Sequence, residues 1–241
     1  MTPAHTTARK FTQTTLLAGA MLLAGWAWLG SSQAAESAVS LPPPAVDEPA
    51  QAGRETAVFA GGCFWGVQAV FQHTQGVLGA VSGYAGGDQA SANYERVSSG
   101  RTGHAEAVQV SFDPRKISYG KLLQIYFSVA HDPTQVNRQG PDPGPQYRSA
   151  VFYQSAQQQH VAQQYIAQLD AAHVFGKQIA TQVVALPAFY PAEPHHQDYA
   201  TRNPNAAYIA TFDLPKIANL KRLFSPIYRE TPVLVGAASG S

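Results

Sequence analysis

The chain has 241 residues, of which 45% are hydrophobic and 13% are charged, which is enough apolar material for one sizeable core. Its 16 basic and 15 acidic residues nearly balance, and no basic patch indicates nucleic acid as a partner. Cys63 is the one cysteine, which excludes a disulfide within the chain.

The N-terminus has the pattern of a secretory signal peptide. Arg9 and Lys10 precede an apolar run over 16–29, and Ser32-Gln-Ala-Ala35 has the small-x-small form of a signal-peptidase site. We expect residues 1–34 to be removed and the protein to be exported to a periplasm. The run is short for a transmembrane helix, and a retained anchor is the alternative. In an oxidising compartment cysteines normally pair, so a lone cysteine there indicates a reactive thiol.

The remaining chain divides by composition. Residues 35–54 include the run Leu41-Pro-Pro-Pro44 and are predicted to be a flexible, solvated linker. Residues 55–228 are expected to form one domain, followed by a flexible C-terminal tail over 229–241.

Hydrophobic patterning predicts strands that alternate with helices. Strands are predicted over 56–60, 77–84, 108–112, 150–153 and 178–186. Three helices are predicted from apolar residues on one face: Phe64, Val67 and Phe71; Leu122, Ile125 and Val129 after a Ser118 cap; and Val161, Tyr165 and Leu169 after a capping box of Ser155 and Gln158. The order βαββαβαβ predicts an α+β fold, a two-layer sandwich whose mixed sheet has a split βαβ (ferredoxin-like) core.

Two stretches match no regular pattern. Residues 131–149 and 189–199 are polar, aromatic and rich in proline. Long loops of this kind carry binding and catalytic groups more often than they fill cores. We therefore expect these long irregular loops to form the site.

Cys63 follows a short apolar strand that breaks on two glycines where a helix is predicted to begin. Backbone N–H groups and the helix dipole at such a position stabilise an anion, which predicts a thiol pKa below the free value of about 8.5. Phe64 and Trp65 place apolar walls beside the sulfur. The alternative is a buried, inert cysteine that packs as a small apolar residue.

A thiolate that attacks a polar substrate also needs a proton donor. Glu106 lies at the start of a strand with an apolar inward face, so partial burial is expected to raise its pKa toward neutrality and keep it protonated. Tyr94, Tyr147 and Tyr199 are candidates to donate hydrogen bonds to a substrate oxygen. The alternatives are a structural carboxylate and packed tyrosines.

Two other functions remain open from the residues alone. A cysteine–histidine hydrolase would draw its base and its orienting carboxylate from His104, His131, His195, His196, Asp142 and Asp198. A metal-binding protein would use Glu193, His195, His196 and Cys63. Adjacent histidines on a strand face opposite ways, although a proline-rich loop can bring them together.

Eight short motifs follow one another between about residues 56 and 223. They are Gly61-Gly-Cys-Phe-Trp-Gly66, Gly83-Tyr-Ala-Gly-Gly87, Gly103-His-Ala-Glu-Ala-Val108, His131-Asp-Pro-Thr-Gln135, Asn137-Arg-Gln-Gly140, Gln146-Tyr-Arg-Ser149, Pro191-Ala-Glu193 and His196-Gln197. Each is moderately specific alone, whereas the ordered set is highly specific. Together they closely resemble the peptide methionine sulfoxide reductases of the A class.

The resemblance implies reduction of the S epimer of methionine sulfoxide, free or in proteins. By motif, Cys63 would be the nucleophile and Glu106 the acid that protonates the sulfoxide oxygen. The substrate-binding residues would be Phe64 and Trp65 at the S-methyl group, Tyr94 and Tyr147 at the oxygen, Asp142 in support and His195 at the pocket rim. No metal or organic cofactor is implied, and Cys63 would become a sulfenic acid.

The sequence departs from the family pattern at four points. It lacks a second cysteine, which implies regeneration by an external thiol: a thioredoxin-like protein, glutathione or a reagent such as dithiothreitol. His195 stands where the family usually has tyrosine, which indicates a tolerated change or an altered pH dependence. Ala90-Ser-Ala92 precedes Asn93 and Tyr94 in place of the usual segment, and Pro141 and Pro143 flank Asp142 closely.

Overall fold

The computed structural model describes residues 1–2, 37–49 and 52–236. The predicted signal peptide falls almost entirely on residues 3–36, outside the described residues. Within the described stretches, no helix is both long and apolar enough to cross a membrane.

Most strands of the described chain form a six-stranded sheet in the order β7-β6-β1-β3-β2-β8. The strands are β1 (Glu55–Gly61), β2 (Val77–Ala85), β3 (Ala105–Phe112), β4 (Arg138–Gln139), β5 (Asp142–Pro143), β6 (Ser149–Tyr153), β7 (Gln182–Ala185) and β8 (Phe189–Pro191). β6 and β7 pair in parallel and the other neighbours are antiparallel, so the sheet is mixed. β3 lies between β1 and β2, which is the split βαβ arrangement. The predicted α+β fold is confirmed.

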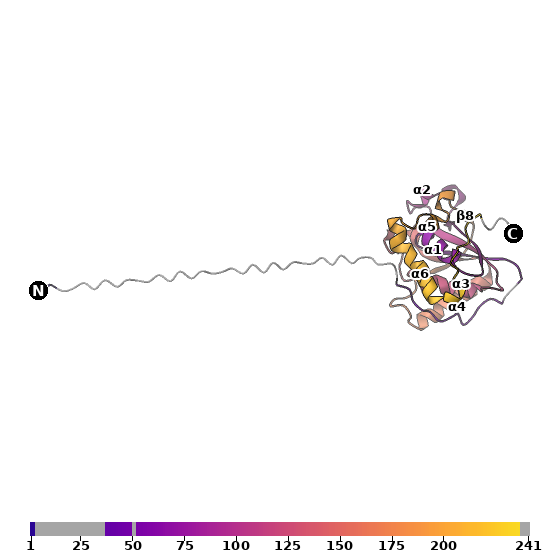
Figure 1. Cartoon of the computed structure of the whole chain (residues 1–241), viewed down its shortest axis with the longest axis horizontal. Helices are drawn as coiled ribbons and strands as arrows, with labels where there is room; N and C mark the ends of the chain where they lie inside the picture. Colours follow the sequence, from indigo (N-terminus) through magenta and orange to yellow (C-terminus); the bar gives the residue numbers. More distant parts are fainter. Residues whose placement is uncertain (3–36, 50–51, 237–241) are drawn as a thin grey trace. The chain divides into compact units, whose positions relative to one another are not determined.

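The helices are α1 (Phe64–Gln72), α2 (Tyr94–Val97), α3 (Tyr119–Ile125), α4 (Ala156–Ala171), α5 (Tyr199–Arg202) and α6 (Leu214–Leu223). Two π-helical turns, η2 (Tyr126–Ala130) and η5 (Ile209–Asp213), continue α3 and precede α6. The 3-10 turns are η1 (Gln89–Ser91), η3 (Pro145–Tyr147), η4 (Pro194–His196) and η6 (Ser225–Ile227). α3 and α4 pack together at one end of the folded part, and α2 lies at the other (Figure 1).

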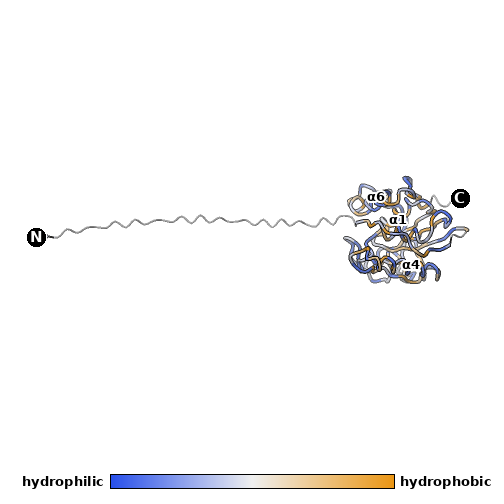
Figure 2. The backbone as a smooth tube through the Cα atoms, turned by 90° about the horizontal axis from the view of Figure 1, so that it is seen from below, coloured by the Kyte–Doolittle hydropathy of each residue, from blue (hydrophilic) through white to orange (hydrophobic). Residues whose placement is uncertain are grey.

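The alternation of side chains along the strands divides the core into two layers. Phe59 of β1 and Val110 of β3 face the helices, and the Phe59 ring stacks on Phe71 of α1 with 5.2 Å between centroids. Val58 and Phe152 belong to a smaller apolar cluster that contains none of the helix residues. Hydrophobic segments of the described chain concentrate inside and hydrophilic ones along the peripheral loops (Figure 2). The helices therefore cover one face of the sheet.

The predicted helix starts are present. Oγ of Ser118 accepts a hydrogen bond from the Lys121 backbone N–H (3.1 Å), and Oγ of Ser155 accepts one from Gln158 N–H (3.0 Å). Only half of the predicted capping box forms, because the Gln158 side chain accepts from the N–H of Gln154 instead of Ser155.

Three predictions, two of loops and one of a strand, need correction. The 131–149 stretch contains the β4–β5 hairpin, and the 189–199 stretch contributes β8 to the edge of the sheet beside β2. The strand predicted over 178–186 begins only at Gln182. Before that point the backbone bonds elsewhere, since the Ala180 N–H donates to the Pro133 carbonyl (2.7 Å).

Residues 37–49 do not behave as the predicted solvated linker. Leu41 is 6% exposed and belongs to the main core. Its carbonyl accepts from the Gln124 side chain (2.7 Å), and the Pro42 carbonyl accepts from the Tyr165 hydroxyl (2.7 Å). Carbonyls of a proline-rich run still accept hydrogen bonds from side chains, although proline offers no N–H. The segment is therefore a strap across α3 and α4.

The start of the C-terminal tail is likewise held to the domain. The Arg229 and Val233 N–H groups donate to the His73 and Gln72 carbonyls, at 2.8 and 3.0 Å, at the end of α1. The predicted flexible tail over 229–241 is therefore wrong for its first residues, and 237–241 lie outside the described residues.

Candidate active site

Cys63 is the N-cap residue of α1, directly after the turn that leaves β1. Gly62 has a φ of 88°, in the left-handed region that favours glycine. A Cβ on Gly62 would lie 2.6 Å from Cγ of Gln139, so a side chain there would clash with the 131–149 loop. The glycine thus lets the chain turn from strand into helix at Cys63, whose side chain is only partly exposed.

The pKa of the Cys63 thiol corrects the prediction from the helix start. Burial raises this pKa well above its ordinary value, and the carboxylates of Glu106 and Asp213 raise it further. The backbone N–H of Trp65 lowers the pKa, as expected at a helix N-terminus, but the desolvation effect is larger. Protonation of Glu106 removes one of the charges that oppose ionisation of the thiol.

Glu106 is 2% exposed and has the same strand parity as Val108 and Val110, which places its side chain on the helix face of β3. Its Oε2 accepts a hydrogen bond from the Phe64 N–H at 3.0 Å. Burial raises the pKa of Glu106 to about 8, the Phe64 N–H lowers it, and Asp142 contributes a further rise. Glu106 is thus a buried acid that holds its proton at neutral pH, and it is hydrogen-bonded to the backbone of the residue that follows the nucleophile.

The predicted catalytic and substrate-binding residues, except His195, line one cavity of about 100 Å³. It is lined by Cys63, Phe64, Trp65, Tyr94, Glu106, Asp142, Tyr147 and Tyr208. All except Tyr208 are residues that the sequence indicated. The unusual segment before Tyr94 and the prolines beside Asp142 do not keep either residue out of the lining. We call this space the small cavity.

The apolar wall of the small cavity is an aromatic stack. Trp65 stacks on Tyr199 with 4.0 Å between centroids, so the Tyr199 ring supports the indole and does not itself line the cavity. His196 is buried between Phe64 (5.4 Å) and Tyr94 (4.4 Å). The wall holds Phe64 and Trp65 beside the Cys63 sulfur.

His195 is not part of the small cavity. Its side chain is exposed, and its ring contacts the site only through His196, at 4.1 Å between centroids. The ring of His195 therefore lies outside the cavity lining, next to the buried ring of His196. His196, next in the chain, supplies the buried ring.

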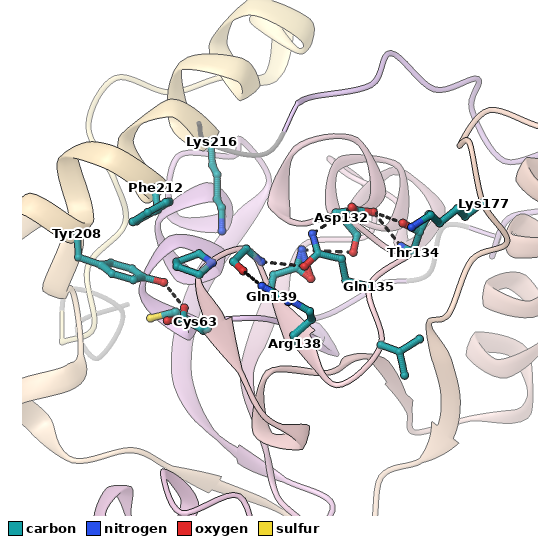
Figure 3. Close-up of a pocket in the computed structure, with 14 residues that line it drawn as sticks. Cys63, Asp132, Thr134, Gln135, Arg138, Gln139, Lys177, Tyr208, Phe212 and Lys216 are labelled. Carbon is teal, nitrogen blue, oxygen red and sulfur yellow. Dashed lines mark hydrogen bonds between the residues drawn. The ribbon is translucent and has the colours of Figure 1, made fainter. Parts of the chain in front are cut away.

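Tyr208 is the cavity residue that the sequence analysis missed. Its hydroxyl donates a hydrogen bond to Oδ2 of Asp142, and burial raises the pKa of both groups (Figure 3). The buried positions Ile209, Asp213, Lys216 and Leu220 have helical spacing. Two of these four buried residues are charged, so the sequence lacks the regular apolar spacing that predicts an amphipathic helix.

Asp213 and Lys216 form a buried pair behind α1. Asp213 is fully buried, and Nζ of Lys216 lies 3.8 Å from its Oδ1. Burial raises the pKa of Asp213 to about 6, while the Lys216 ammonium lowers it. A Cβ on Gly66 would lie 2.2 Å from the same Oδ1, so the close approach requires glycine in α1.

The histidines do not form a hydrolase dyad with Cys63. In the described part of the chain no histidine hydrogen-bonds to the thiol. His104 bonds the Gly87 N–H (3.2 Å) and the Asp88 carbonyl (2.8 Å). His131 bonds the Tyr126 carbonyl and Ser149 Oγ, and burial lowers its pKa to about 3.

The metal-binding alternative is not favoured either. Across residues 1–2, 37–49 and 52–236, no group of three or more histidine, cysteine or acidic side chains is arranged to hold a metal ion. The oxygens of Glu193 instead accept hydrogen bonds from the Tyr84 hydroxyl (2.8 Å) and the Tyr94 N–H (2.9 Å).

A second, larger space also reaches Cys63. It has a volume of about 610 Å³ and lies between the 131–149 loop and the η5–α6 segment (Figure 3). The two spaces share Cys63, Asp142 and Tyr208 and otherwise have different walls. We call this space the large cavity.

Comparison with known proteins gives a consistent result. The family model "Peptide methionine sulfoxide reductase" matches residues 55–225. "Peptide methionine sulfoxide reductase MsrA 2" of Mesorhizobium japonicum is 58% identical over 194 residues, 80% of this chain and 100% of the relative. The protein of the same name from Synechocystis is 53% identical over 173 residues, 72% of this chain and 81% of the relative.

Solved structures of the same kind match the fold. Mxr1 from Saccharomyces cerevisiae in reduced form aligns with a TM-score of 0.60 at 32% identity, covering 69% of this chain and 94% of that one. Methionine sulfoxide reductase A of Corynebacterium diphtheriae aligns with a TM-score of 0.56 at 32% identity, covering 73% and 91%. With a family model over most of the chain and relatives matched nearly end to end, the chain belongs to the A class of the peptide methionine sulfoxide reductase family.

Proposed function

We propose that this protein reduces the S epimer of methionine sulfoxide, free or in proteins, with Cys63 as nucleophile and Glu106 as proton donor. The observation that carries these roles is the shared small cavity, in which a protonated, buried carboxyl group is held by the N–H of the residue after the cysteine. A sulfoxide sulfur becomes a good electrophile as its oxygen gains a proton, so the step needs an acid and a sulfur nucleophile side by side.

The first half of the reaction follows from this pairing. The sulfoxide oxygen lies toward Glu106 and the phenols of Tyr94 and Tyr147, and the S-methyl group lies against Phe64 and Trp65. Glu106 gives its proton to the sulfoxide oxygen as the Cys63 sulfur attacks the substrate sulfur. The proton of the Cys63 thiol then passes to Glu106. The bond between the two sulfurs then breaks as the hydroxyl group moves from the substrate sulfur to Cys63, which becomes a sulfenic acid, and the sulfoxide is reduced to methionine.

The second half of the reaction needs a thiol from outside the chain, because Cys63 is the one cysteine. A first thiol attacks the sulfenic sulfur and forms a mixed disulfide with loss of water. A second thiol then attacks the mixed disulfide, which releases Cys63 and an external disulfide. The donor is a thioredoxin-like protein or a small thiol.

The decisive experiment is turnover of the separated sulfoxide epimers with dithiothreitol. We expect methionine from the S epimer, none from the R epimer, and a sulfenic acid on Cys63 that a sulfenate-specific reagent traps after substrate is added without reductant. Cys63→Ser should abolish both signals. Equal turnover of both epimers, or an untrapped Cys63, would overturn the assignment.

The site of action belongs to the same proposal. The basic and apolar N-terminal segment supports export to a periplasm, where oxidised exported proteins would be the substrates. N-terminal sequencing of the protein from cell fractions tests this. A mature start near residue 35 in the periplasmic fraction is expected, and an intact N-terminus in the cytoplasm would contradict it.

A further inference from the structure

The large cavity offers Cys63 a second approach that the reduction of the sulfoxide does not use. The small cavity, at about 100 Å³, has room for the methyl sulfoxide end of a side chain, whereas the large cavity, at about 610 Å³, is in the size range of sites for complete small molecules. Only Cys63, Asp142 and Tyr208 belong to both. Two reactants of different size could therefore reach one sulfur.

The chemistry of regeneration requires such a second approach. The incoming thiol displaces oxygen from the sulfenic sulfur, and its sulfur must approach in line with the S–O bond, from the side away from the departing oxygen. Glu106, Tyr94 and Tyr147 belong to the small cavity alone, so the oxygen lies on that side. The large cavity is the space that remains for the attacking thiol.

The walls of the large cavity favour an anion. Arg138, Lys177 and Lys216 supply three cations, and in the described part of the chain Arg138 and Lys177 have no acidic partner within ion-pair distance. Two carboxylates also line the cavity, so its three cations are in excess by one, and each carboxylate accepts hydrogen bonds within the protein. Asp132 accepts from Thr134 and Gln135, and Asp142 accepts from Tyr208.

The cations lie at different depths. Lys216 of α6 is buried, whereas Arg138 and Lys177 are exposed, and all three side chains line the cavity (Figure 3). Lys216 already neutralises Asp213, which leaves the outer pair for a ligand. Arginine and lysine both bind carboxylates, and arginine does so with a planar pair of N–H groups.

Given the function proposed above, on which this inference rests, we propose that the large cavity binds a low-molecular-weight thiol carrying carboxylates, held by Arg138 and Lys177 with its sulfur directed at Cys63. One such thiol forms the mixed disulfide with loss of water, and a second releases Cys63 and leaves as half of a symmetrical disulfide. The cavity is large enough for a peptide-sized thiol.

The test compares two thiols that differ only in their carboxylates, glutathione and its diethyl ester. The second-order rate constant for regeneration of the Cys63 sulfenic acid is measured with each, at fixed S-epimer substrate, for the wild type and for Arg138→Gln/Lys177→Gln. We expect the wild type to favour glutathione and the ratio of the two constants to fall about tenfold in the double variant. Raising the ionic strength should also lower the wild-type ratio, since the Arg138 and Lys177 side chains are exposed.

The matched control is Lys116→Gln/Arg222→Gln, which removes one lysine and one arginine from exposed positions outside both cavities. Its ratio should equal that of the wild type. An unchanged ratio in Arg138→Gln/Lys177→Gln would overturn the proposal, as would a rise in KM for a peptide sulfoxide with the ratio preserved, which would assign the cavity to the substrate chain. If Arg138→Gln/Lys177→Gln slows regeneration by a thioredoxin-like protein but not by either small thiol, the large cavity belongs to a protein donor. Failure of the wild type with every thiol would instead contradict the proposed function.

Discussion

The small and large cavities that meet at Cys63 are built from different parts of the chain. The small one takes its acid from β3 and its aromatic wall from the start of α1, whereas the large one is formed by the 131–149 loop and the η5–α6 segment. The small cavity is acidic and aromatic, and the large one contains most of the cations near the sulfur. The difference indicates that oxygen transfer and thiol exchange are separated in space, with one cysteine exposed to both.

The largest effect should come from the acid of the small cavity. Glu106→Gln keeps the shape of the side chain and can still accept the Phe64 N–H, but it cannot supply a proton. We expect kcat for sulfoxide reduction to fall by about 10² to 10⁴, the range for a positioned general acid. Glu95→Gln, at an exposed position, is the control. Normal activity in Glu106→Gln would remove Glu106 from the acid role.

The buried pair of Asp213 and Lys216 should matter most for stability. Lys216→Met leaves the Asp213 carboxylate fully buried without its cation, which should cost about 3 kcal/mol of unfolding free energy in urea. Asp213→Asn/Lys216→Met removes both charges and should recover much of the loss. If the double variant is as unstable as Lys216→Met, the pair does not act through its charges.

The pH dependence should follow the Glu106 carboxyl group. Its pKa is about 8, so kcat/KM for the sulfoxide should fall about tenfold for each pH unit above 8. The fall should be absent from the residual activity of Glu106→Gln. A rate that rises through pH 8 to 9 would indicate that the Cys63 thiolate alone limits the reaction.

The same pKa has a consequence for stability with the opposite sign from most carboxylates. Between about pH 4.5 and 8 folded Glu106 keeps the proton that the unfolded chain has lost, so stability falls as pH rises through this window. Glu106→Gln should flatten the dependence of Tm on pH there. An unchanged slope would contradict the raised pKa.

A smaller effect is expected from Tyr208, which both cavities share. Tyr208→Phe keeps the ring and deletes the hydroxyl that bonds Asp142. Loss of one hydrogen bond to a carboxylate should lower kcat/KM for sulfoxide about fivefold to tenfold. Regeneration of Cys63 by the external thiol should slow as well. If only sulfoxide reduction or only regeneration slows, Tyr208 contributes to one cavity and not to both. Tyr153→Phe, outside both cavities, is the control.

The sequence predicted the side of the site that is formed by local structure. Cys63, Phe64 and Trp65 follow directly from a strand, two glycines and a helix start, and Glu106 follows from strand alternation next to Val108 and Val110. Most strands could be located for the same reason, because alternation along a strand is a short-range pattern. These features need only a few neighbouring residues.

The other side depends on contacts that no local pattern contains. Tyr208 reaches Asp142 across 66 positions of the chain, on a helix whose buried face includes two charges. The pKa of Cys63 was predicted in the wrong direction because its desolvation and its nearby carboxylates arise from tertiary packing. The strap over 37–49 looked polar and proline-rich, but Leu41 packs in the core and side chains of α3 and α4 donate hydrogen bonds to its carbonyls.

The smallest effect should come from His195, although it is the most visible departure from the family pattern. Its side chain is exposed and reaches the small cavity only through His196, so a change there alters neither the lining nor a hydrogen bond to the reacting groups. His195→Tyr should leave kcat and KM for the S epimer within about twofold of the wild type, the range of surface substitutions. His196→Ala is the matched comparison, because it opens a void between Phe64 and Tyr94 and should raise KM severalfold. A larger response from His195→Tyr than from His196→Ala would mean that substrate contacts the exposed ring, and the boundary of the small cavity would then extend beyond His196.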